Sequence, residues 1–434
     1  MRGIVAMVAG AAALASATCA LAQPHKRAGW PGPLTIGESF GVQVKEWETS
    51  EAELDAIEAA GFGLLRFGIG WPYVENAQGE YDWQKYDRFI ASVRMRSFRS
   101  IVILWGSHSS YVGANRAKGS EAHPQGLPAP VSEQAVRGFA RFASAAAKRY
   151  AGEDITWELW NEPDLDRFWP PKADGDAYAR LALATCQAVR QVALSAKIIG
   201  PASATMPGWK AMRDPGFSRT VLQSPLTSCI DALSFHSYRI ERGAAPKSPE
   251  SVMADNARAA DFVASNTPKD RSRLPLICSE WGFNSVDLTE QEQAAYVVRT
   301  HLSNLLSGVP VTVWYEWRDS LQSPKDPEAH FGLVDFQRNA KPALTAVRSL
   351  LPLIGDHTVV RRLQTPDPRD FVVLLRGPNH GRKLLFWTSR RSHAGDLFLD
   401  LGTSEQRFSM DALPRAVSLG PEDADPSIVI GEAR

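Results

Sequence analysis

The chain has 434 residues, and its 48 lysines and arginines balance its 48 aspartates and glutamates, so it carries no formal net charge. A nucleic-acid or acidic-membrane partner would require a basic excess, and the balance argues against both. The apolar fraction of 44% is ordinary for a globular protein, and the length suits one large domain plus a smaller one.

Residues 1–22 have the pattern of a secretory signal peptide. Arg2 precedes an uninterrupted run of small and apolar residues that ends in Ala20-Leu21-Ala22. We expect cleavage before Gln23 and a mature protein that is secreted or periplasmic, with no membrane insertion. A membrane anchor is the alternative, but the run is rich in alanine and lacks a charged far flank.

Three cysteines remain after this cleavage: Cys186, Cys229 and Cys278. An odd number in an exported protein of this size does not describe a disulfide framework. We therefore expect three mostly buried thiols and a fold stabilised by a conventional core.

From about residue 35, short β-rich runs alternate with helical stretches. Ser50-x-x-Glu53 and Thr289-x-x-Glu292 are capping boxes that mark two helix starts. Alternation predicts a parallel sheet, and eight repeats predict a closed (β/α)₈ TIM barrel over residues 35–354. An open doubly wound sheet is the alternative, weakened because no glycine-rich phosphate motif follows the first strand. The eight candidate strands lie at 35–44, 64–69, 100–105, 155–160, 197–200, 230–238, 274–281 and 311–317.

Residues 355–434 predict a small antiparallel β-sandwich. Short alternating or apolar runs are separated there by turn sequences such as Pro-Asn-His-Gly at 378–381. A carbohydrate-binding appendage is one interpretation. We favour a structural module packed on the barrel flank, because Phe386, Trp387 and Phe398 lie in apolar strand runs, where core packing is the default.

Two of the eight strands run into a glutamate. Glu162 follows the fourth strand in WELWNEP, and Glu280 follows the seventh in ICSEW. Active sites of TIM barrels lie at the carboxyl ends of the strands, and strands four and seven face each other across the mouth. Two carboxylates flanking one bond are what glycoside cleavage requires. A structural salt bridge is the alternative for either glutamate alone, but Asn161 beside Glu162 can hydrogen-bond a sugar hydroxyl.

The segment WNEPDLDRFW, at 160–169, resembles the acid/base segment of clan A glycoside hydrolases, and its continuation resembles family 39 in particular. Ser279-Glu280-Trp281-Gly282 is closer to family 5. The resemblance spans about residues 37–351, and the arrangement of an exported barrel with a small β tail resembles enzymes that trim bacterial exopolysaccharides. Five strands carry matching residues in order: Arg66, Glu162, His236 with Tyr238, Glu280 and Trp314.

The resemblance implies a retaining glycosidase that cleaves a β-linked poly- or oligosaccharide by double displacement, with no cofactor and no metal. Glu280 would be the nucleophile, kept ionised by Arg66 and the Tyr238 hydroxyl. Glu162 would act first as acid and then as base, with its pKa raised by apolar neighbours such as Trp160. The two carboxylates would lie about 5–5.5 Å apart.

Other polar and aromatic residues at strand ends are candidates for binding the sugar. Tryptophan faces suit the C–H groups of sugars, although core packing is the alternative for about half of those at the mouth. His108 serves equally well as a loop hydrogen-bond partner, and the nine histidines lack metal-ligand spacing. The full set of candidates is Asn161, Arg66, His236, Tyr238, Trp314, Trp281, Trp169 and His108.

We expect a monomeric enzyme whose partner is a carbohydrate chain. The row of tryptophans at the mouth favours internal cleavage of a polymer, and an exopolysaccharide is the expected substrate. One alternative is an exo-acting β-glycosidase on short oligosaccharides. The other is a catalytically silent sugar-binding barrel, which a lost carboxylate would mark, and both glutamates are present.

Overall fold

The structure is a computed structural model, and it describes residues 34–96, 98–114, 127–207, 215–238, 247–269, 274–320, 323, 325–390, 395–400, 405–419 and 430–431. The predicted signal peptide, residues 1–22, lies outside these residues.

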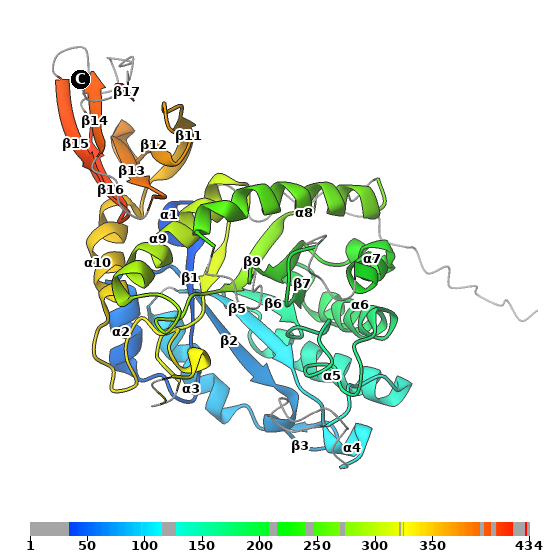
Figure 1. Ribbon diagram of the computed structural model, residues 1–434. Coiled ribbons are helices and arrows are strands. Elements are labelled where there is room, and N and C mark those ends of the chain that lie inside the picture. Colours follow the sequence, from blue (N-terminus) through cyan, green and yellow to red (C-terminus); the bar gives the residue numbers. More distant parts are fainter. Residues whose placement is uncertain are drawn as a thin grey trace, which may run out of the picture.

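Eight parallel strands close into a barrel in the order β1-β10-β9-β8-β7-β6-β5-β2, which confirms the predicted TIM barrel (Figure 1). Each predicted β-rich run overlaps one of them, although the first and last runs contribute only four and three residues. The bounds are β1 Phe40–Gln43, β2 Leu64–Gly70, β5 Arg99–Trp105, β6 Ile155–Leu159, β7 Lys197–Ser203, β8 Ala232–His236, β9 Leu276–Trp281 and β10 Thr312–Trp314.

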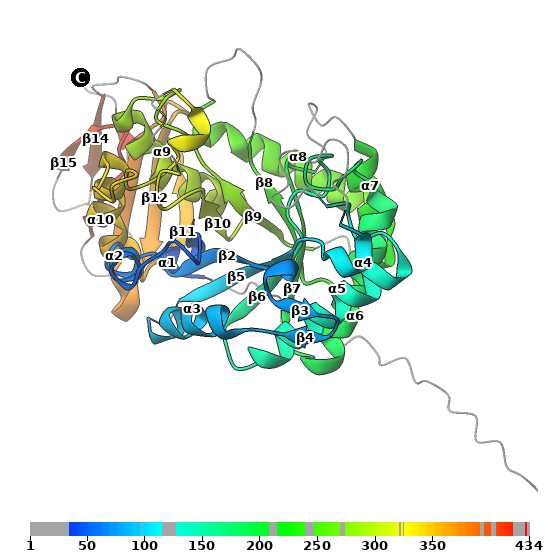
Figure 2. The same ribbon diagram turned by 90° about the horizontal axis from the view of Figure 1, so that it is seen from below.

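Helices surround the barrel, and a two-stranded hairpin of β3 (Glu75–Ala77) and β4 (Glu80–Tyr81) lies at its rim (Figure 2). Both predicted capping boxes form, with Ser50 capping α2 and Thr289 capping α9. The α-helices are α1 Ile36–Ser39, α2 Glu51–Ala59, α3 Gln84–Met95, α4 Ser109–Val112, α5 Glu133–Arg149, α6 Gly175–Val192, α7 Pro215–Gln223, α8 Val252–Asn266, α9 Glu290–Leu306 and α10 Pro342–Ile354. Short 3₁₀ turns are η1 Trp71–Tyr73, η2 Pro225–Ser228, η3 Pro249–Ser251, η4 Pro327–Ala329 and η5 Pro378–His380.

The barrel interior changes character along the strands. Near the amino ends, apolar side chains that include Leu64, Ile101, Ile199 and Ile277 form a closed cluster. Side chains alternate along a strand, so Arg66 points to the same side of β2 as Leu64, one layer nearer the mouth. Arg66 is fully buried. A layer of charged groups therefore lies directly above an apolar plug.

After α10 the chain forms two antiparallel sheets, of order β11-β12-β13-β16 and β15-β14-β17. They pack face to face around a small core, in which the rings of Phe386 and Phe408 lie 5.3 Å apart. This is the predicted β-sandwich. Its strands are β11 Thr358–Leu363, β12 Asp370–Arg376, β13 Arg382–Thr388, β14 Gly395–Asp400, β15 Glu405–Met410, β16 Arg415–Ser418 and β17 Ile430–Gly431.

The sandwich packs on the flank of the barrel beside α9 and α10 (Figure 1). Phe371 and Trp387 stack at 4.8 Å and join the main core. The indole Nε1 of Trp387 donates to Glu250 Oε1 at 2.8 Å, and Arg299 donates twice to the same carboxylate at 2.6 and 2.7 Å. Trp387 is thus a docking residue. The side chain of Phe398 lies outside the described residues.

The expectation of three thiols is wrong for two cysteines. Cys186 on α6 and Cys229, which ends η2, form a disulfide, and Cys278 is a free buried thiol. The two pair because α6 packs against the turn that leads into β8. One bridge plus one thiol satisfies an odd count as well as three thiols do. In the described part of the chain, no helix has the length and apolar character needed to span a membrane.

Candidate active site

The structure brings Glu162 and Glu280 together at the mouth of the barrel. Glu280 lies within β9, and Glu162 follows the end of β6. One oxygen of each carboxylate and one ring nitrogen of His236 all lie within 4.8 Å of one another. This spacing is of the size that retaining glycosidases use and is shorter than the 6.5–9.5 Å of inverting enzymes.

The backbone after β6 is strained in a way that aims Glu162. Trp160 and Glu162 have φ angles of 73° and 47°, which residues other than glycine seldom adopt. The Glu162 amide donates to the carbonyl of Ala202 at 2.9 Å, which fixes the turn against β7. Such conformations cost about 1–3 kcal/mol each and gather at functional sites, where the surrounding structure holds them in place.

His236, at the end of β8, lies between the two carboxylates. Its Nδ1 is 2.8 Å from Glu162 Oε1 and 3.9 Å from Glu280 Oε1. The ring is fully buried, and its Nε2 lies 3.4 Å from Arg66. His236 is therefore a hydrogen-bond partner of the Glu162 carboxylate rather than a side chain that faces the open cleft.

Arg66 organises the charged layer. Its Nη1 donates to Glu280 Oε2 at 2.7 Å and to Gln43 Oε1 at 2.5 Å. Its Nε donates to Glu158 Oε2 at 2.8 Å, and its Nη2 donates to the Asn161 amide oxygen at 2.9 Å. One planar guanidinium thus fixes the nucleophile candidate and the amide beside the acid candidate.

Glu158 and Gln43 were not among the residues predicted from the sequence. A signal for Glu158 exists, because Thr156, Glu158 and Trp160 alternate along a strand whose residues are all buried, and a buried carboxylate requires a cation. Gln43, the last residue of β1, carries no comparable signal. Its role depends on the register that pairs it with Arg66.

Tyr238 completes the surroundings of Glu280. Its hydroxyl donates to Glu280 Oε1 at 3.2 Å. Burial, together with the charge of Glu280, raises the pKa of Tyr238 well above 10, so the hydroxyl keeps its proton and acts as a donor. Glu280 therefore accepts a hydrogen bond on each of its two oxygens, one from Arg66 and one from Tyr238.

The pKa of Glu162 differs from the sequence-based prediction. Burial does raise it, but the hydrogen bond and charge of His236, with a smaller effect of Arg167, outweigh burial and hold the pKa below its ordinary value. Burial lowers the pKa of His236, while the charges of Glu280 and Glu162 outweigh burial and raise it. The expectation that apolar neighbours raise the pKa of Glu162 is wrong for the free protein, because it omitted His236. The two side chains hold one proton as a pair.

Arg167, from the loop after β6, is a further neighbour of Glu162 that the sequence analysis missed. Its guanidinium lies 3.4 Å from Glu162 Oε2 and 4.6 Å from the ring of Phe168. The side chain is 56% exposed, so its charge is screened by solvent.

The three tryptophans predicted to bind sugar are packing residues. Trp314, Trp281 and Trp169 are each at most 1% exposed and offer no ring face to a ligand. The Trp314 indole donates to the Phe331 carbonyl at 3.0 Å, and Trp169 packs edge-on against Trp160. Trp281 and Trp314 end β9 and β10, and Trp169 lies in the loop after Glu162, as predicted, but all three are buried.

His108 is also a structural residue here. Its Nε2 lies 2.9 Å from the carbonyl oxygen of Glu75, and its Nδ1 accepts from the Ser110 amide. The ring is buried and holds the loop after β5 against the hairpin after β2. The loop interpretation of His108 therefore holds.

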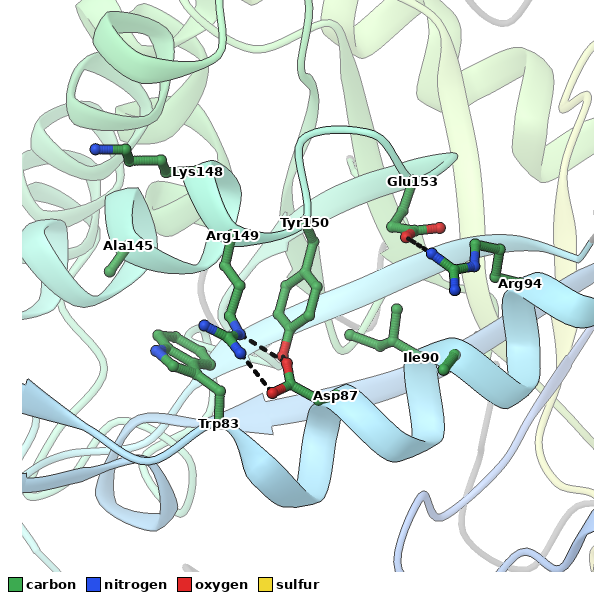
Figure 3. Close-up of a pocket in the computed structure, with 10 residues that line it drawn as sticks. Trp83, Asp87, Ile90, Arg94, Ala145, Lys148, Arg149, Tyr150 and Glu153 are labelled. Atoms are coloured by element: carbon green, nitrogen blue, oxygen red, sulfur yellow. Dashed lines mark hydrogen bonds and ion pairs between the residues drawn. The ribbon is translucent and has the colours of Figure 1, made fainter.

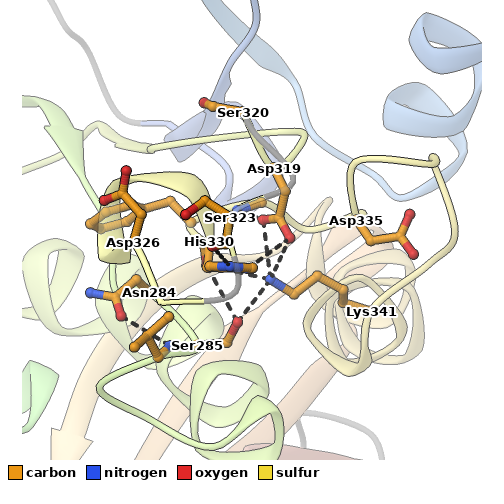
Figure 4. A network of polar contacts seen from close by, with 12 residues as sticks. Asn284, Ser285, Asp319, Ser320, Ser323, Asp326, His330, Asp335 and Lys341 are labelled. Atoms are coloured by element: carbon orange, nitrogen blue, oxygen red, sulfur yellow. Dashed lines mark hydrogen bonds and ion pairs between the residues drawn. The ribbon is translucent and has the colours of Figure 1, made fainter.

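The long segment after β10 is fixed by a buried ion pair. Lys341 Nζ lies 3.2 Å from Asp319 Oδ1 and 3.2 Å from the Ser285 hydroxyl (Figure 4). Asp319 also accepts from the amide of Gly332 at 2.7 Å, and His330 lies beside it. This network ties the loops after β9 and β10 to the start of α10, and so holds one wall of the mouth.

A groove of about 610 Å³ lies outside the barrel, between α3 and α5. Figure 3 shows its polar contacts: Arg149 pairs with Asp87, the Tyr150 hydroxyl donates to Asp87, and Arg94 pairs with Glu153. These groups neutralise one another on the helical surface, far from β9 and Glu280. The groove is not part of the candidate active site.

At the mouth of the barrel, Glu162, His236 and Glu280 offer three ligand atoms that lie close enough together to hold a metal ion. Arg66 argues against this use, because its guanidinium already lies 2.7 Å from Glu280 and would repel a second cation.

The sequence of this chain matches the profile of one protein family. The profile described as cellulase, glycosyl hydrolase family 5, matches residues 27–320. No curated protein sequence matches the chain.

Several solved structures are similar in fold. A family 39 glycoside hydrolase from the gut symbiont Bacteroides cellulosilyticus is 20% identical, with a TM-score of 0.67 over 89% of this chain and 82% of that chain. A monomeric beta-xylosidase from Caulobacter crescentus is 17% identical, with a TM-score of 0.62 over 93% and 95%. A GH30 endoxylanase from Clostridium papyrosolvens is 12% identical, with a TM-score of 0.56 over 90% and 95%. At these identities the likeness establishes the fold.

Proposed function

The chain belongs to the cellulase family, glycosyl hydrolase family 5, and is a retaining glycoside hydrolase of clan A; from this premise we propose that Glu280 is its nucleophile and Glu162 its acid and base. The observation that carries the proposal is the placement of the two carboxylates within 4.8 Å, with Arg66 and Tyr238 donating to Glu280 and not to Glu162.

In the first step, Glu280 attacks the anomeric carbon while the bond from that carbon to the leaving oxygen breaks. The proton for the leaving oxygen comes from the Glu162–His236 pair, which holds it at the 2.8 Å contact. Arg66 and Tyr238 hold the Glu280 carboxylate in position through their two hydrogen bonds. The product of this step is a glycosyl ester of Glu280 and a released alcohol.

In the second step, Glu162 acts as a base. It takes a proton from water, whose oxygen attacks the anomeric carbon and breaks the ester bond. The sugar leaves with its original configuration, and the proton returns to the Glu162–His236 pair. Asn161, held by Arg66, lies beside this path and is placed to bind a sugar hydroxyl.

We further propose a β-linked polysaccharide as substrate, cleaved internally, and a bacterial exopolysaccharide as the polymer. Support for this finer assignment comes from the resemblance of the barrel-plus-sandwich arrangement to enzymes of that kind. The buried tryptophans no longer support internal cleavage.

Export from the cytoplasm is proposed on two grounds. The first 22 residues have the pattern of a signal peptide. In addition, the Cys186–Cys229 disulfide suits an oxidising compartment. N-terminal sequencing of the mature protein tests this, with Gln23 as the expected first residue and an intact Met1 as the contradicting result.

A screen of the purified protein against a panel of β-linked polysaccharides tests the proposed function. Glu162→Gln serves as the blank, because it keeps the shape of the side chain but supplies neither acid nor base. We expect reducing ends to appear with the wild type alone, as a ladder of oligosaccharides. Monosaccharide as the sole product would favour the exo-acting alternative. Hydrolysis of no glycan in the panel would favour a sugar-binding protein.

A further inference from the structure

The loops after β6 and β10 carry two oppositely charged side chains at the mouth of the barrel. Arg167 belongs to the loop after β6, and Glu328 lies in η4, in the segment after β10. In the closed order of eight strands, β6 and β10 are four positions apart, so their loops begin on opposite sides of the barrel. Both side chains are exposed. A cation and an anion are thus contributed to the same opening from its two sides.

The two oxygens of Glu162 have different surroundings. Oε1 lies 2.8 Å from Nδ1 of His236, and Oε2 lies 3.4 Å from Nη2 of Arg167. Because His236 is fully buried and Arg167 is 56% exposed, Oε2 is the oxygen on the open side of the carboxyl group. A leaving oxygen reaches Glu162 from that side. In the proposed mechanism, Oε2 therefore gives a proton in the first step and takes one from water in the second.

Arg167 in this position opposes the first of these two steps. A guanidinium has only N–H donors, so it can bind Oε2 only while that oxygen is an acceptor. A proton on Oε2 would point at a donor that also carries a positive charge. Burial raises the pKa of Glu162, but His236 and then Arg167 outweigh burial and lower it. Arg167 must therefore leave Oε2 before Glu162 can protonate a leaving group.

The contact between Arg167 and Glu162 is weak enough to break in every turnover. Its 3.4 Å exceeds the range of ordinary N–H···O bonds, which ends at about 3.2 Å, and solvent screens the charge. The guanidinium also lies 4.6 Å from the centre of the half-buried Phe168 ring. Exposed side chains change rotamer within nanoseconds. Movement of Arg167 is therefore fast compared with the chemical steps.

Glu328 is placed to receive the guanidinium. Burial raises the pKa of Glu328, and the charge of Arg167 lowers it more than any other neighbouring charge does. The charges of Glu280 and Glu162 raise the same pKa, so the Glu328 carboxyl group lies within range of both proposed catalytic residues. Arg167 thus has a second carboxylate within its reach, outside the position that a leaving oxygen must occupy.

The backbone around Glu328 is held in place by the residues that flank η4 (Figure 4). Asp326 caps η4 and accepts from the Glu328 amide at 3.1 Å. The carbonyl of His330 accepts from the Ser285 amide at 3.1 Å, and its ring Nε2 lies 2.7 Å from the carbonyl oxygen of Ser323. The Glu328 side chain therefore projects from a fixed support.

We propose that Arg167 is a positioning residue that alternates between Glu162 and Glu328. On Glu162, it stabilises the carboxylate that serves as the base. On Glu328, it leaves Oε2 uncovered, so that Glu162 can carry the acid proton. The inference rests on the proposed function and extends it, because it names the side chains that move Glu162 between its two roles.

The titration of Glu162 depends on groups from every element around it. Apart from Arg167 and Glu328, these groups are half-buried or buried, so they cannot move without disturbing the barrel. They are His236 and Tyr238 at and after the end of β8, Glu280 of β9, and Asp164 of the turn that carries Glu162.

Titration of the His236 ring by NMR of the full-length protein tests the proposal without any substrate. Arg167→Met should raise the midpoint of the Glu162–His236 pair by about half a pH unit, the size expected for one screened charge. Glu328→Gln should lower the midpoint by a similar amount, because Arg167 then remains on Glu162. In the Arg167→Met background, Glu328→Gln should lower it by less than half as much, since only the direct effect of the Glu328 charge remains.

Kinetics on two aryl glycosides separate this role from a merely structural one. The probes are the phenyl and dinitrophenyl glycosides of the sugar that the polysaccharide panel identifies, since phenolate needs a proton to leave and dinitrophenolate does not. Glu328→Gln should lower kcat/KM for the phenyl glycoside about threefold on the alkaline limb, matching half a pH unit. The dinitrophenyl glycoside should react as with the wild type. An equal fall for both glycosides would overturn the proposal.

Arg137→Met is the matched control, because Arg137 is 58% exposed and paired with Glu133 on α5, outside the barrel. It should leave the midpoint unchanged. The alternation is overturned if Arg167→Met leaves the midpoint where it is, or if Glu328→Gln shifts it equally with and without Arg167, as two fixed charges would. Normal hydrolysis by Glu280→Ala would instead overturn the proposed function, and it would leave these titrations unaffected.

Discussion

Two buried arginines mark two different regions of this protein. Arg66 lies in the charged layer of the barrel, and Arg299 of α9 lies where the sandwich docks on η3 and α9. Each is at most 2% exposed, and each donates to a glutamate at less than 3 Å. A buried ion pair is therefore not in itself a sign of an active site in this fold.

The two regions differ in how their charges balance. Arg299 faces one carboxylate, Glu250, which also accepts from the Trp387 indole. The opposite charges of Arg299 and Glu250 cancel, and both side chains are buried. Arg66 faces a layer with three carboxylates: Glu158 and Glu280 bond to it directly, and Glu162 reaches it through His236. One proton on the Glu162–His236 pair reduces this excess of negative charge, and the proposed mechanism transfers that proton to the leaving oxygen.

The largest effect should follow from removing the proposed nucleophile, Glu280. Glu280→Ala should lower kcat on the order of 10⁴-fold or more, because no other group can attack the anomeric carbon from that side. Azide fits the space left by the side chain and should restore turnover with inverted product, as NMR of the first-formed sugar would show. The fold should persist, with unchanged circular dichroism. Normal hydrolysis by this variant would rule out the assignment of Glu280.

Breaking the Arg299–Glu250 ion pair should have the opposite effect from Glu280→Ala: it should lower stability and leave kcat unchanged. Arg299→Met leaves Glu250 buried without its cation and should lower the free energy of unfolding by about 3–5 kcal/mol, measured in denaturant. The kcat of the folded fraction should not change. The matched control is Glu250→Leu combined with Arg299→Met, which removes both charges and should regain most of the stability. A large loss of kcat from Arg299→Met would mean that the two regions are not separate.

The shared proton predicts how activity falls at high pH. The reactive form carries one proton on the Glu162–His236 pair, and the pKa of His236 is raised above its ordinary 6.5. The alkaline limb of kcat/KM should therefore have a midpoint above pH 6.5, with about a tenfold fall per pH unit beyond it. A midpoint below 6.5 would contradict the proton-sharing arrangement.

The free energy of unfolding should also depend on the protonation of the Glu162–His236 pair. The raised pKa of His236 contributes stability that is complete below pH 6.5 and is lost as pH rises through the folded-state pKa. The lowered pKa of Glu162 contributes stability that is complete above pH 4.5 and is lost as pH falls. The wild type should therefore exceed Glu162→Gln in unfolding free energy most clearly between about pH 4.5 and 6.5. A difference that grows above pH 7 would contradict this.

The smallest effect should come from the indole at the docking site. Trp387→Phe keeps most of the packing against Phe371 but removes the hydrogen bond to Glu250. The free energy of unfolding should fall by about 1–2 kcal/mol, with no change in kcat. Thermal unfolding of this variant beside the wild type measures it. No loss of stability would mean that the hydrogen bond contributes little to docking.

The barrel and its two glutamates could be predicted from the sequence because both depend on local patterns. Apolar runs mark buried strands, and a glutamate directly after such a run must lie at the carboxyl end of the barrel. Glu158 could have been predicted in the same way, since its position in a strand buried on both faces requires a cation. It was missed because it lies within β6 and not at its carboxyl end.

The remaining features depend on how distant segments meet. Burial of Trp314 and exposure of Arg167 are decided by loops, which no strand pattern describes. The lowered pKa of Glu162 depends on a histidine 74 residues away along the chain. The Cys186–Cys229 pairing depends on the packing of α6 beside η2, and cysteine number alone leaves it open.

The covalent intermediate provides the most direct test of the account. Glu162→Gln, given a glycoside with a leaving group that departs without a proton, should form the ester but hydrolyse it slowly, since no base remains. Mass spectrometry should then find the added sugar on the peptide that contains Glu280. A sugar bound to any other residue, or turnover with no adduct at all, would contradict the central role given to Glu280.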